Sequence, residues 1–385
     1  MKRIFIGSMI IMSLTLGIWG YSNAKKDFIE ILKTNSQSLY LWNATMVGED
    51  ELISKNREVM IKLIENEPLL KEKLKEYEEY RGLSDEDIQN LTIESLKDIN
   101  IDTVYLNAGY TKGIYKKIKH EIYKDERRED KKLNNEDLLS DLNKQITGEK
   151  YLRENHEKYN SFIKIASQNG IKVEALYGTP EWALEKNYES FKGQVKDVLN
   201  HNKDYKEGRF TAVHLDIEPH GLKEYKENKK KILDEYVDNL KKIKKLVDKH
   251  NKENNDELHI VIDIPISYEE GMITKLLDNV DEIVVMNYFN KIETYKKSGQ
   301  KIMSIVDEYN KNNNSHKKVK IASEFQPYED LKYNTLYHMN KKELRTYFNK
   351  GIREFEKYDC YDGVAMHEYE YYREYLKKMY EDQVQ

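Results

Sequence analysis

The stretch Phe210-Thr211-Ala212-Val213-His214-Leu215-Asp216-Ile217-Glu218-Pro219-His220 decides how the rest of the chain is interpreted. With a period of two, Val213, Leu215 and Ile217 supply one apolar, strand-forming face. The opposite face carries four ionisable side chains, which are His214, Asp216, Glu218 and His220. Burying such groups beside an apolar strand is costly unless they have partners or a purpose. Pro219 ends the strand directly after Glu218, so both carboxylates are expected at its carboxyl end.

Seven further stretches have the short, apolar character of buried strands, and helical patterns separate most of them. One such helix begins at Ser84, which with Asp87 three residues later resembles a capping box. The predicted strands cover residues 38–42, 101–106, 171–177, 210–218, 258–264, 281–288, 319–325 and 363–368. The predicted helices include residues 84–97, 151–167, 222–249, 269–277, 298–309 and 341–358.

Eight strands that alternate with helices predict a parallel α/β sheet with crossover helices. Eight is also the number of strands that closes a (β/α)8 TIM barrel. The alternative is an open doubly wound sheet, which usually has a glycine-rich phosphate loop after its first strand, and Asn43-Ala44-Thr45-Met46 is not one. We therefore predict a (β/α)8 barrel with helical, highly charged insertions in its early loops.

The first 24 residues have the pattern of a bacterial-type secretory signal peptide. Lys2 and Arg3 are basic, residues 4–20 are apolar, and Ser22-Asn23-Ala24 is a small-residue cleavage site. An uncleaved membrane anchor is the alternative, for which the apolar segment is short. We predict an extracellular protein that leaves the membrane after cleavage, with residues 25–385 as one barrel domain. Residues 46–83 and 115–148 are predicted to be helical or partly disordered insertions.

The composition narrows the classes of partner. The formal net charge is −5 with acids and bases interspersed, which indicates neither a nucleic-acid partner nor an anionic membrane. Cys360 is the single cysteine, so no intramolecular disulfide forms. The sequence has no cysteine spacing typical of a metal site and no glycine-rich cofactor loop, so neither a metal nor a cofactor is expected. Its 30 tyrosines suit a carbohydrate cleft without proving one, and the oligomeric state stays open.

In such a barrel the carboxyl ends of the strands converge on one face, where active sites are built. Carboxylates and aromatic side chains dominate these positions. They are Trp42, Asn107, Glu181, Trp182, Asp216, Glu218, Asp263, Tyr288, Glu324, His367 and Glu368. Paired carboxylates with Trp and Tyr platforms are typical of glycoside hydrolysis, in which one acid protonates the leaving oxygen.

Three of these strands resemble the family 18 chitinases. The fourth strand resembles that family's Asp-x-x-Asp-x-Asp-x-Glu signature, keeping Asp216 and Glu218 but with Thr211 and His214 at the first two Asp positions. Met286-Asn287-Tyr288 resembles the Met-x-Tyr of its sixth strand. Gly363-Val364-Ala365-Met366-His367-Glu368 resembles its eighth strand, with His367 in place of a sugar-stacking Trp.

The resemblance implies hydrolysis of an N-acetylated glycan, in a cell wall or a host polysaccharide, by substrate assistance. It implies that Glu218 is the general acid and then the base, and that Asp216 orients the N-acetyl group while Tyr288 donates a hydrogen bond to it. Residues two apart on a strand have Cα atoms about 6.5–7 Å apart, so both carboxylates can reach one sugar ring. The remaining candidates are expected to bind substrate. They are Trp42, Asn107, Trp182, His214, Asp263, His367 and Glu368.

A second enzymatic interpretation uses two glutamates. Glu218-Pro219 also resembles the Asn-Glu-Pro of retaining glycosidases, with Ile217 in place of the Asn, and Ala322-Ser323-Glu324-Phe325 resembles their strand-seven nucleophile. Glu218 is then the acid/base and Glu324 the nucleophile, about 5–5.5 Å away. Both interpretations agree on Glu218 and differ on whether Glu324 forms a covalent bond.

Three other interpretations stay open. His214, Asp216, Glu218 and His220 also have the residue types of a divalent metal site. A secreted barrel that binds carbohydrate without hydrolysing it would explain the altered positions Thr211 and His214. In the third, Asp216 and Glu218 are a buried hydrogen-bonded pair with a purely structural role.

Overall fold

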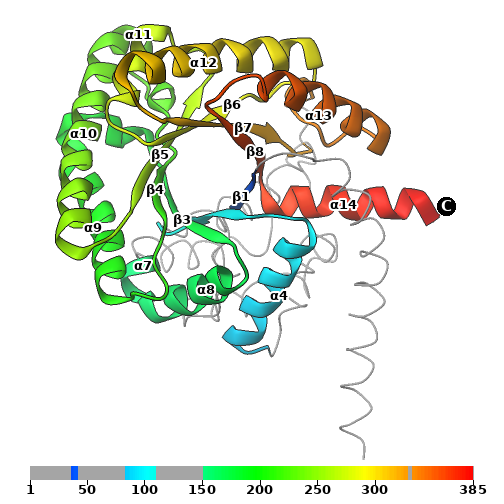
Figure 1. The fold of residues 1–385 in the computed structure, drawn as a ribbon, viewed down its shortest axis with the longest axis horizontal. Coiled ribbons are helices and arrows are strands. Elements are labelled where there is room, and N and C mark those ends of the chain that lie inside the picture. The colour runs from blue at the N-terminus through cyan, green and yellow to red at the C-terminus, as the bar shows by residue number, and fades with distance from the viewer. Residues whose placement is uncertain (1–35, 42–82, 110–150, 328–331, 385) are drawn as a thin grey trace, which may run out of the picture.

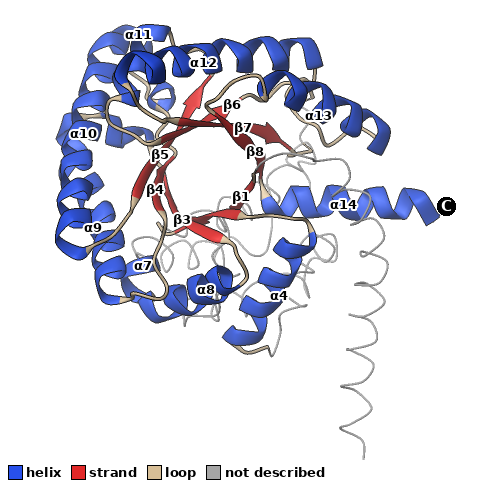
Figure 2. Cartoon of the chain, viewed as in Figure 1, coloured by secondary structure: helices blue, strands red, loops and turns tan. Residues whose placement is uncertain are grey.

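Eight parallel strands close into a ring in the computed structural model, which describes residues 36–41, 83–109, 151–327 and 332–384. Each strand pairs with its neighbours in chain order, and β1 and β8 close the ring through pairs such as Gln37 with Val364. The prediction of a (β/α)8 barrel is therefore confirmed, and the open sheet is excluded (Figures 1 and 2). The strands are β1 (Gln37–Leu41), β2 (Thr103–Asn107), β3 (Lys172–Tyr177), β4 (Ala212–Leu215), β5 (His259–Pro265), β6 (Glu282–Met286), β7 (Lys318–Glu324) and β8 (Tyr361–His367).

Helices surround the ring of strands (Figure 2). They are α4 (Asp85–Asp98), α7 (Tyr151–Glu154), α8 (His156–Gln168), α9 (Tyr188–Asp204), α10 (Tyr225–Asn254), α11 (Glu270–Leu277), α12 (Ile292–Asn313), α13 (Lys341–Phe355) and α14 (Tyr369–Val384). None of them is long and apolar enough to cross a membrane within the described part of the chain.

The helix ends follow local sequence signals. Ser84 caps α4 and exchanges hydrogen bonds with Asp87, so the predicted capping box is confirmed. The predicted helix over residues 151–167 is interrupted at Asn155, which separates α7 from α8. Helix α9 is not among the predicted helices, and it covers the barrel before β4 and buries Phe191 and Val195.

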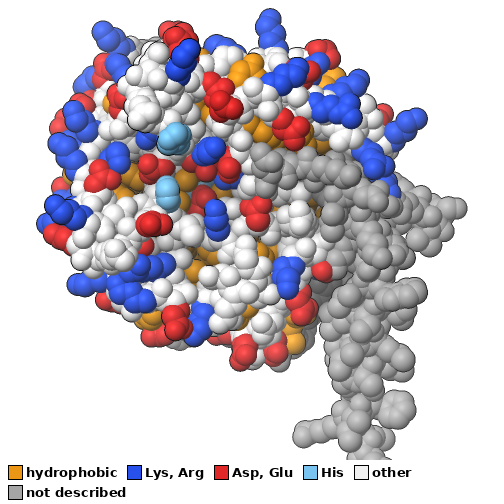
Figure 3. All heavy atoms as spheres, in the orientation of Figure 1, with side chains coloured by type: hydrophobic (Ala, Val, Ile, Leu, Met, Phe, Trp, Pro, Cys, Tyr) orange, Lys and Arg blue, Asp and Glu red, His pale blue; other side chains and the backbone are white. Residues whose placement is uncertain are grey.

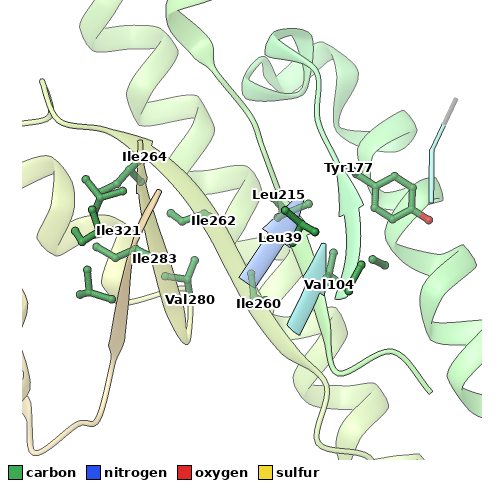
Figure 4. Close-up of a cluster of buried hydrophobic side chains, with 14 of the residues drawn as sticks. Leu39, Val104, Tyr177, Leu215, Ile260, Ile262, Ile264, Val280, Ile283 and Ile321 are labelled. Carbon is green, nitrogen blue, oxygen red and sulfur yellow. The ribbon is translucent and has the colours of Figure 1, made fainter. Parts of the chain in front are cut away.

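The alternation of side chains gives the barrel two apolar layers. Leu215 of β4 points outward into a core shared with the helices, as do the strand residues Leu39, Ile260 and Ile262 (Figure 4). Val213 belongs to the same core. The opposite side chains fill the barrel interior. This inner cluster consists of Tyr40, Tyr105, Leu176, Ala212, Val261, Val284, Ala322 and Ala365, with Tyr288 packed against it. The polar face predicted for β4 is therefore the inside of the barrel, where His214 is fully buried.

Several predicted segments lie outside the described residues. They are the signal peptide, the insertion at 115–148, Trp42, and all of the insertion at 46–83 except Leu83. On the face of the described chain that Figure 3 shows, acidic and basic side chains are interspersed, as the small net charge predicts.

Candidate active site

The carboxyl end of β4 is held close to the end of β3. The Asp216 backbone N–H donates to the Tyr177 carbonyl over 2.7 Å, and a Cβ on Gly178 would lie only 2.0 Å from the Asp216 carbonyl oxygen. Only glycine fits that approach, so the sequence Tyr177-Gly178 fixes where Asp216 sits. The regular strand ends at Leu215, earlier than predicted, and Pro219 begins a short 3-10 turn (Pro219–Gly221).

Asp216 and Glu218 differ in their exposure. Glu218 is the open group, with 40% of its side chain accessible and its Oε1 3.5 Å from His220 Nε2. Asp216 is half-buried, and its Oδ1 is buried with no hydrogen-bond partner among the described residues. Burial raises the pKa of Asp216 well above its usual value, and repulsion by Asp263 and Glu218 raises it further. A solvent-reachable carboxylate therefore stands beside a carboxyl group that favours its protonated form.

A buried polar cluster lies beneath Asp216. His214 donates from Nδ1 to Glu174 Oε2 over 2.7 Å, and its Nε2 lies 3.3 Å from Asp263 Oδ1. The Tyr40 hydroxyl donates to the same Asp263 oxygen over 2.5 Å. Burial alone lowers the pKa of His214, but Asp263 and Glu174 outweigh it and raise that pKa to about 10. His214 is therefore an imidazolium near neutral pH.

The far side of the site is formed by β6, β7 and β8. His367 donates from Nδ1 to Glu324 Oε2 over 2.9 Å, and its ring lies 5.8 Å from that of Tyr288 and 5.1 Å from that of Tyr40, centroid to centroid. Although burial lowers the pKa of His367, the charge of Glu324 and its hydrogen bond raise that pKa to about 9. The Gln326 backbone N–H donates to Glu324 Oε1 over 2.7 Å. Both oxygens of Glu324 are thus engaged.

Tyr288 connects the two sides of this site. It is half-buried and packs against the inner cluster, and burial followed by repulsion from Glu324 and Asp263 raises the pKa of its hydroxyl well above the usual value. The hydroxyl therefore stays protonated and can donate a hydrogen bond to a ligand. The structure brings seven of the predicted residues together at this end of the barrel. These are His214, Asp216, Glu218, Asp263, Tyr288, Glu324 and His367.

Other predicted substrate-binding residues lie elsewhere. Trp182 is 6% exposed and stacks on Phe191 in the outer core, so its prediction as a sugar platform is wrong. The reason is that the chain after β3 turns back at Pro180 and directs the indole toward α9. Asn107 is buried, and its Oδ1 accepts from the Gly109 backbone N–H over 3.0 Å, a role in shaping the turn.

The prediction that His214 and Asp263 line the site is also wrong. Both are completely or almost completely buried, so they lie under the site and do not line it. Glu368 is half-buried next to His367. In the described ranges no group of three or more His, Cys, Asp or Glu residues could hold a metal ion. His214 is buried between Glu174 and Asp263, whereas His220 is exposed beside Glu218.

Two residues of the site were not predicted. Tyr40 bonds Asp263, and Glu174 bonds His214. The sequence held a signal for each of them. A period of two places Tyr40 on the same strand face as Trp42, and Glu174 is a charged residue within the otherwise apolar strand 171–177.

No protein-family model matches the sequence, and no curated protein is significantly similar to it. Among solved structures, the chain is similar to a xylanase–α-amylase inhibitor protein in complex with trehalose, with 10% identity over 89% of this chain and 97% of that chain and a TM-score of 0.40. A family 18 chitinase from Pseudoalteromonas aurantia has 14% identity over 58% of this chain and 81% of that chain, with a TM-score of 0.39. A family 18 chitinase from Cycas revoluta in complex with (GlcNAc)3 has 9% identity over 61% and 88%, with a TM-score of 0.36. Because these sequence identities and TM-scores are low, the assignment of the fold as a barrel rests on the strand pairing within this chain.

Proposed function

We propose that this protein is a secreted glycoside hydrolase that acts on an N-acetylated glycan, with Glu218 as its general acid and then its base. The observation that carries the proposal is the pairing of an accessible Glu218 with the half-buried Asp216 at the carboxyl end of β4. Two carboxyl groups with such different surroundings are suited to different roles in one reaction.

The roles follow from the surroundings. Glu218 is accessible enough to reach a glycosidic oxygen and to receive a proton back from water. Asp216 lies deeper, where it can orient the acetamido group of a bound sugar, and the Tyr288 hydroxyl can donate to that group's carbonyl. The acetamido oxygen then attacks the anomeric carbon while the glycosidic C–O bond breaks and the leaving oxygen takes the proton of Glu218, so no protein nucleophile is needed. Water, deprotonated by Glu218, then attacks the anomeric carbon, releases the acetamido oxygen and returns the proton to Glu218.

The contacts of Glu324 favour this mechanism over the two-glutamate one. A nucleophilic carboxylate needs one oxygen directed at the anomeric carbon, whereas each Glu324 oxygen already accepts a hydrogen bond, from Gln326 or from His367. A covalent mechanism would have to give up one of these bonds. Glu324 is therefore proposed to hold His367 in place beneath the sugar.

The test compares Glu218→Gln with Glu227→Gln, a matched change at an exposed glutamate in the first turn of α10. Hydrolysis of an aryl N-acetylglucosaminide and of N-acetylated cell-wall glycan is measured, and circular dichroism checks the fold. We expect the Glu218 variant to lose about 100-fold or more in kcat, as removal of a general acid does, and the control to keep full activity. Full activity of a folded Glu218→Gln protein would refute the proposal. Sugar binding without turnover in the unaltered protein would instead support a carbohydrate-binding barrel.

A further inference from the structure

Tyr333 differs from every other large hydrophobic side chain in the described part of the chain, because it alone is exposed, at 64%. It lies between β7 and α13. The loops that follow the strands of such a barrel gather at the carboxyl end, which is the end that carries Glu218. A single exposed aromatic residue is ordinary on a protein surface, so exposure alone indicates no site. The case for Tyr333 depends on how firmly it is held and on what lies beside it.

The segment around Tyr333 is fixed to two residues of the candidate active site. Asn334 donates from Nδ2 to the Tyr288 carbonyl over 2.7 Å, and the Leu336 backbone N–H donates to the Glu324 carbonyl over 2.8 Å. The Leu336 side chain is only 1% exposed, so it anchors the base of the segment in the core. The backbone that carries Tyr333 therefore keeps a fixed place beside Tyr288 and Glu324.

The loop after β6 holds the same segment through Asn290. The Asn290 backbone N–H donates to the Tyr333 carbonyl over 3.3 Å, and its side-chain Nδ2 donates to the Lys332 carbonyl over 2.6 Å. Both hydrogen bonds end on backbone carbonyl groups, so they fix the start of the Tyr333 side chain without covering its ring. A ring that is already held in place loses less conformational freedom when it binds a ligand.

The surroundings of the Tyr333 ring suit a sugar better than a protein. Lys332 Nζ lies 5.2 Å from the centre of the ring. One flat apolar surface with a polar group beside it matches a pyranose, whose C–H groups can pack on the ring while a hydroxyl accepts from the ammonium group. A protein partner would need a contiguous apolar patch, and no second large hydrophobic side chain is exposed among the described residues.

We propose that Tyr333 forms a second carbohydrate subsite at the rim of the barrel, where its ring stacks on a pyranose unit of the same glycan chain whose bond Glu218 cleaves. The identity of the glycan rests on the proposed function, whereas the binding role of Tyr333 requires no turnover. A glycan long enough to reach both places makes a contact that a short one lacks. The affinity of the protein is therefore set by chain length as well as by the sugar at Glu218.

The test uses the full chain carrying Glu218→Gln, so that bound oligosaccharides are not consumed. Isothermal titration calorimetry measures the binding of β-1,4-linked N-acetylglucosamine oligomers, from the disaccharide to the hexasaccharide. We expect the Kd to fall once an oligomer is long enough to reach Tyr333. Adding Tyr333→Ala should remove that gain, because the stacking contact is lost. The Kd of the long oligomers should then rise about 2- to 10-fold, and that of the disaccharide should stay the same.

Two further variants on the same background separate stacking from other effects. Tyr333→Phe keeps the ring and should bind as the parent does. Tyr358→Ala is the matched control, since it removes a half-buried tyrosine between α13 and β8, at the opposite end of the barrel, and it should leave every Kd unchanged. Circular dichroism checks that each variant folds, which the exposure of Tyr333 leads us to expect.

Unchanged binding in Tyr333→Ala, an equal loss at every chain length, or the same loss in the Tyr358 control would overturn the proposal. A protein that binds none of these oligomers would overturn it as well. If long oligomers bind in a manner that depends on Tyr333 while the unaltered protein hydrolyses no glycan, the proposed hydrolase activity fails and the subsite stands.

Discussion

Acid is expected to destabilise the segment that leads into β4, because His201 is buried there in a neutral state. His201 is fully buried on α9, and its Nε2 donates to the Gly208 carbonyl over 2.9 Å. Its Nδ1 must therefore accept the 3.0 Å hydrogen bond from His156 Nδ1. The next residue, Asn202, bonds both backbone groups of Phe210 just before the strand. A proton on His201 would set two N–H groups against each other in this contact.

The size of the effect follows from the pKa of His201. Burial is the main cause that lowers this pKa to about 4, against about 6.5 for an unfolded histidine. Between these two values the unfolded chain binds more protons than the folded one, so the free energy of unfolding rises with pH. The stabilisation is complete above the unfolded pKa and is lost as the pH falls toward the folded pKa. At about 1.4 kcal/mol per pKa unit, the full loss is about 3 kcal/mol.

Urea denaturation at several values between about pH 7 and pH 4.5 measures this loss, within the window set by the two pKa values. His201→Gln removes the titrating group and keeps a donor for the Gly208 carbonyl. Between about pH 7 and pH 4.5 the free energy of unfolding of the unaltered protein should therefore fall by about 2–3 kcal/mol more than that of the variant. The matched control is His259→Gln, at a histidine whose side chain is 60% exposed. Parallel curves for the unaltered protein and His201→Gln would refute the reasoning.

The other predictions concern the site and the targeting signal. Glu324→Gln should retain far more hydrolytic activity than Glu218→Gln, and trapping of a fluorosugar on Glu324, detected by mass spectrometry, would instead establish the covalent mechanism. Dialysis against a chelator should leave the rate of glycan hydrolysis unchanged, because substrate assistance needs no metal, and a loss restored by a divalent cation would contradict this. Gly178→Ala should unfold the protein or lower its melting temperature strongly, since the new Cβ would meet the Asp216 carbonyl, whereas Gly271→Ala, with open space around it, should not. The mature protein from a culture supernatant should begin at Lys25, as N-terminal sequencing can determine.

The barrel could be predicted from the sequence because its signals are local. Short apolar runs, with a period of two in residues 210–218, marked all eight strands to within a few residues, and Ser84 with Asp87 marked the start of α4. Helix α9 was not predicted, because its buried positions include polar residues such as His201 and Asn202, which weaken the apolar pattern. Helical propensity and period are properties of neighbouring residues, so they carry this part of the fold.

The partners of His214 could not be predicted, because they depend on how the strands are staggered. In the ladder His214 lies opposite Leu176 on β3 and Val261 on β5. Its polar partners are displaced along the neighbouring strands, since Glu174 comes two residues before Leu176 and Asp263 comes two residues after Val261. Strand tilt in a closed barrel produces such diagonal neighbours, and the tilt is a property of the whole ring.

This stagger also explains how a histidine can stand at position 214, where the resemblance to the family 18 chitinases leads one to expect an aspartate. The imidazole of His214 has Nδ1 2.7 Å from Glu174 Oε2 and Nε2 3.3 Å from Asp263 Oδ1, so each ring nitrogen faces a carboxyl oxygen. An aspartate at this position would instead place a third carboxyl group beside those two, with no donor between them. The carboxyl groups that β3 and β5 bring to this position therefore suit a histidine better than an aspartate.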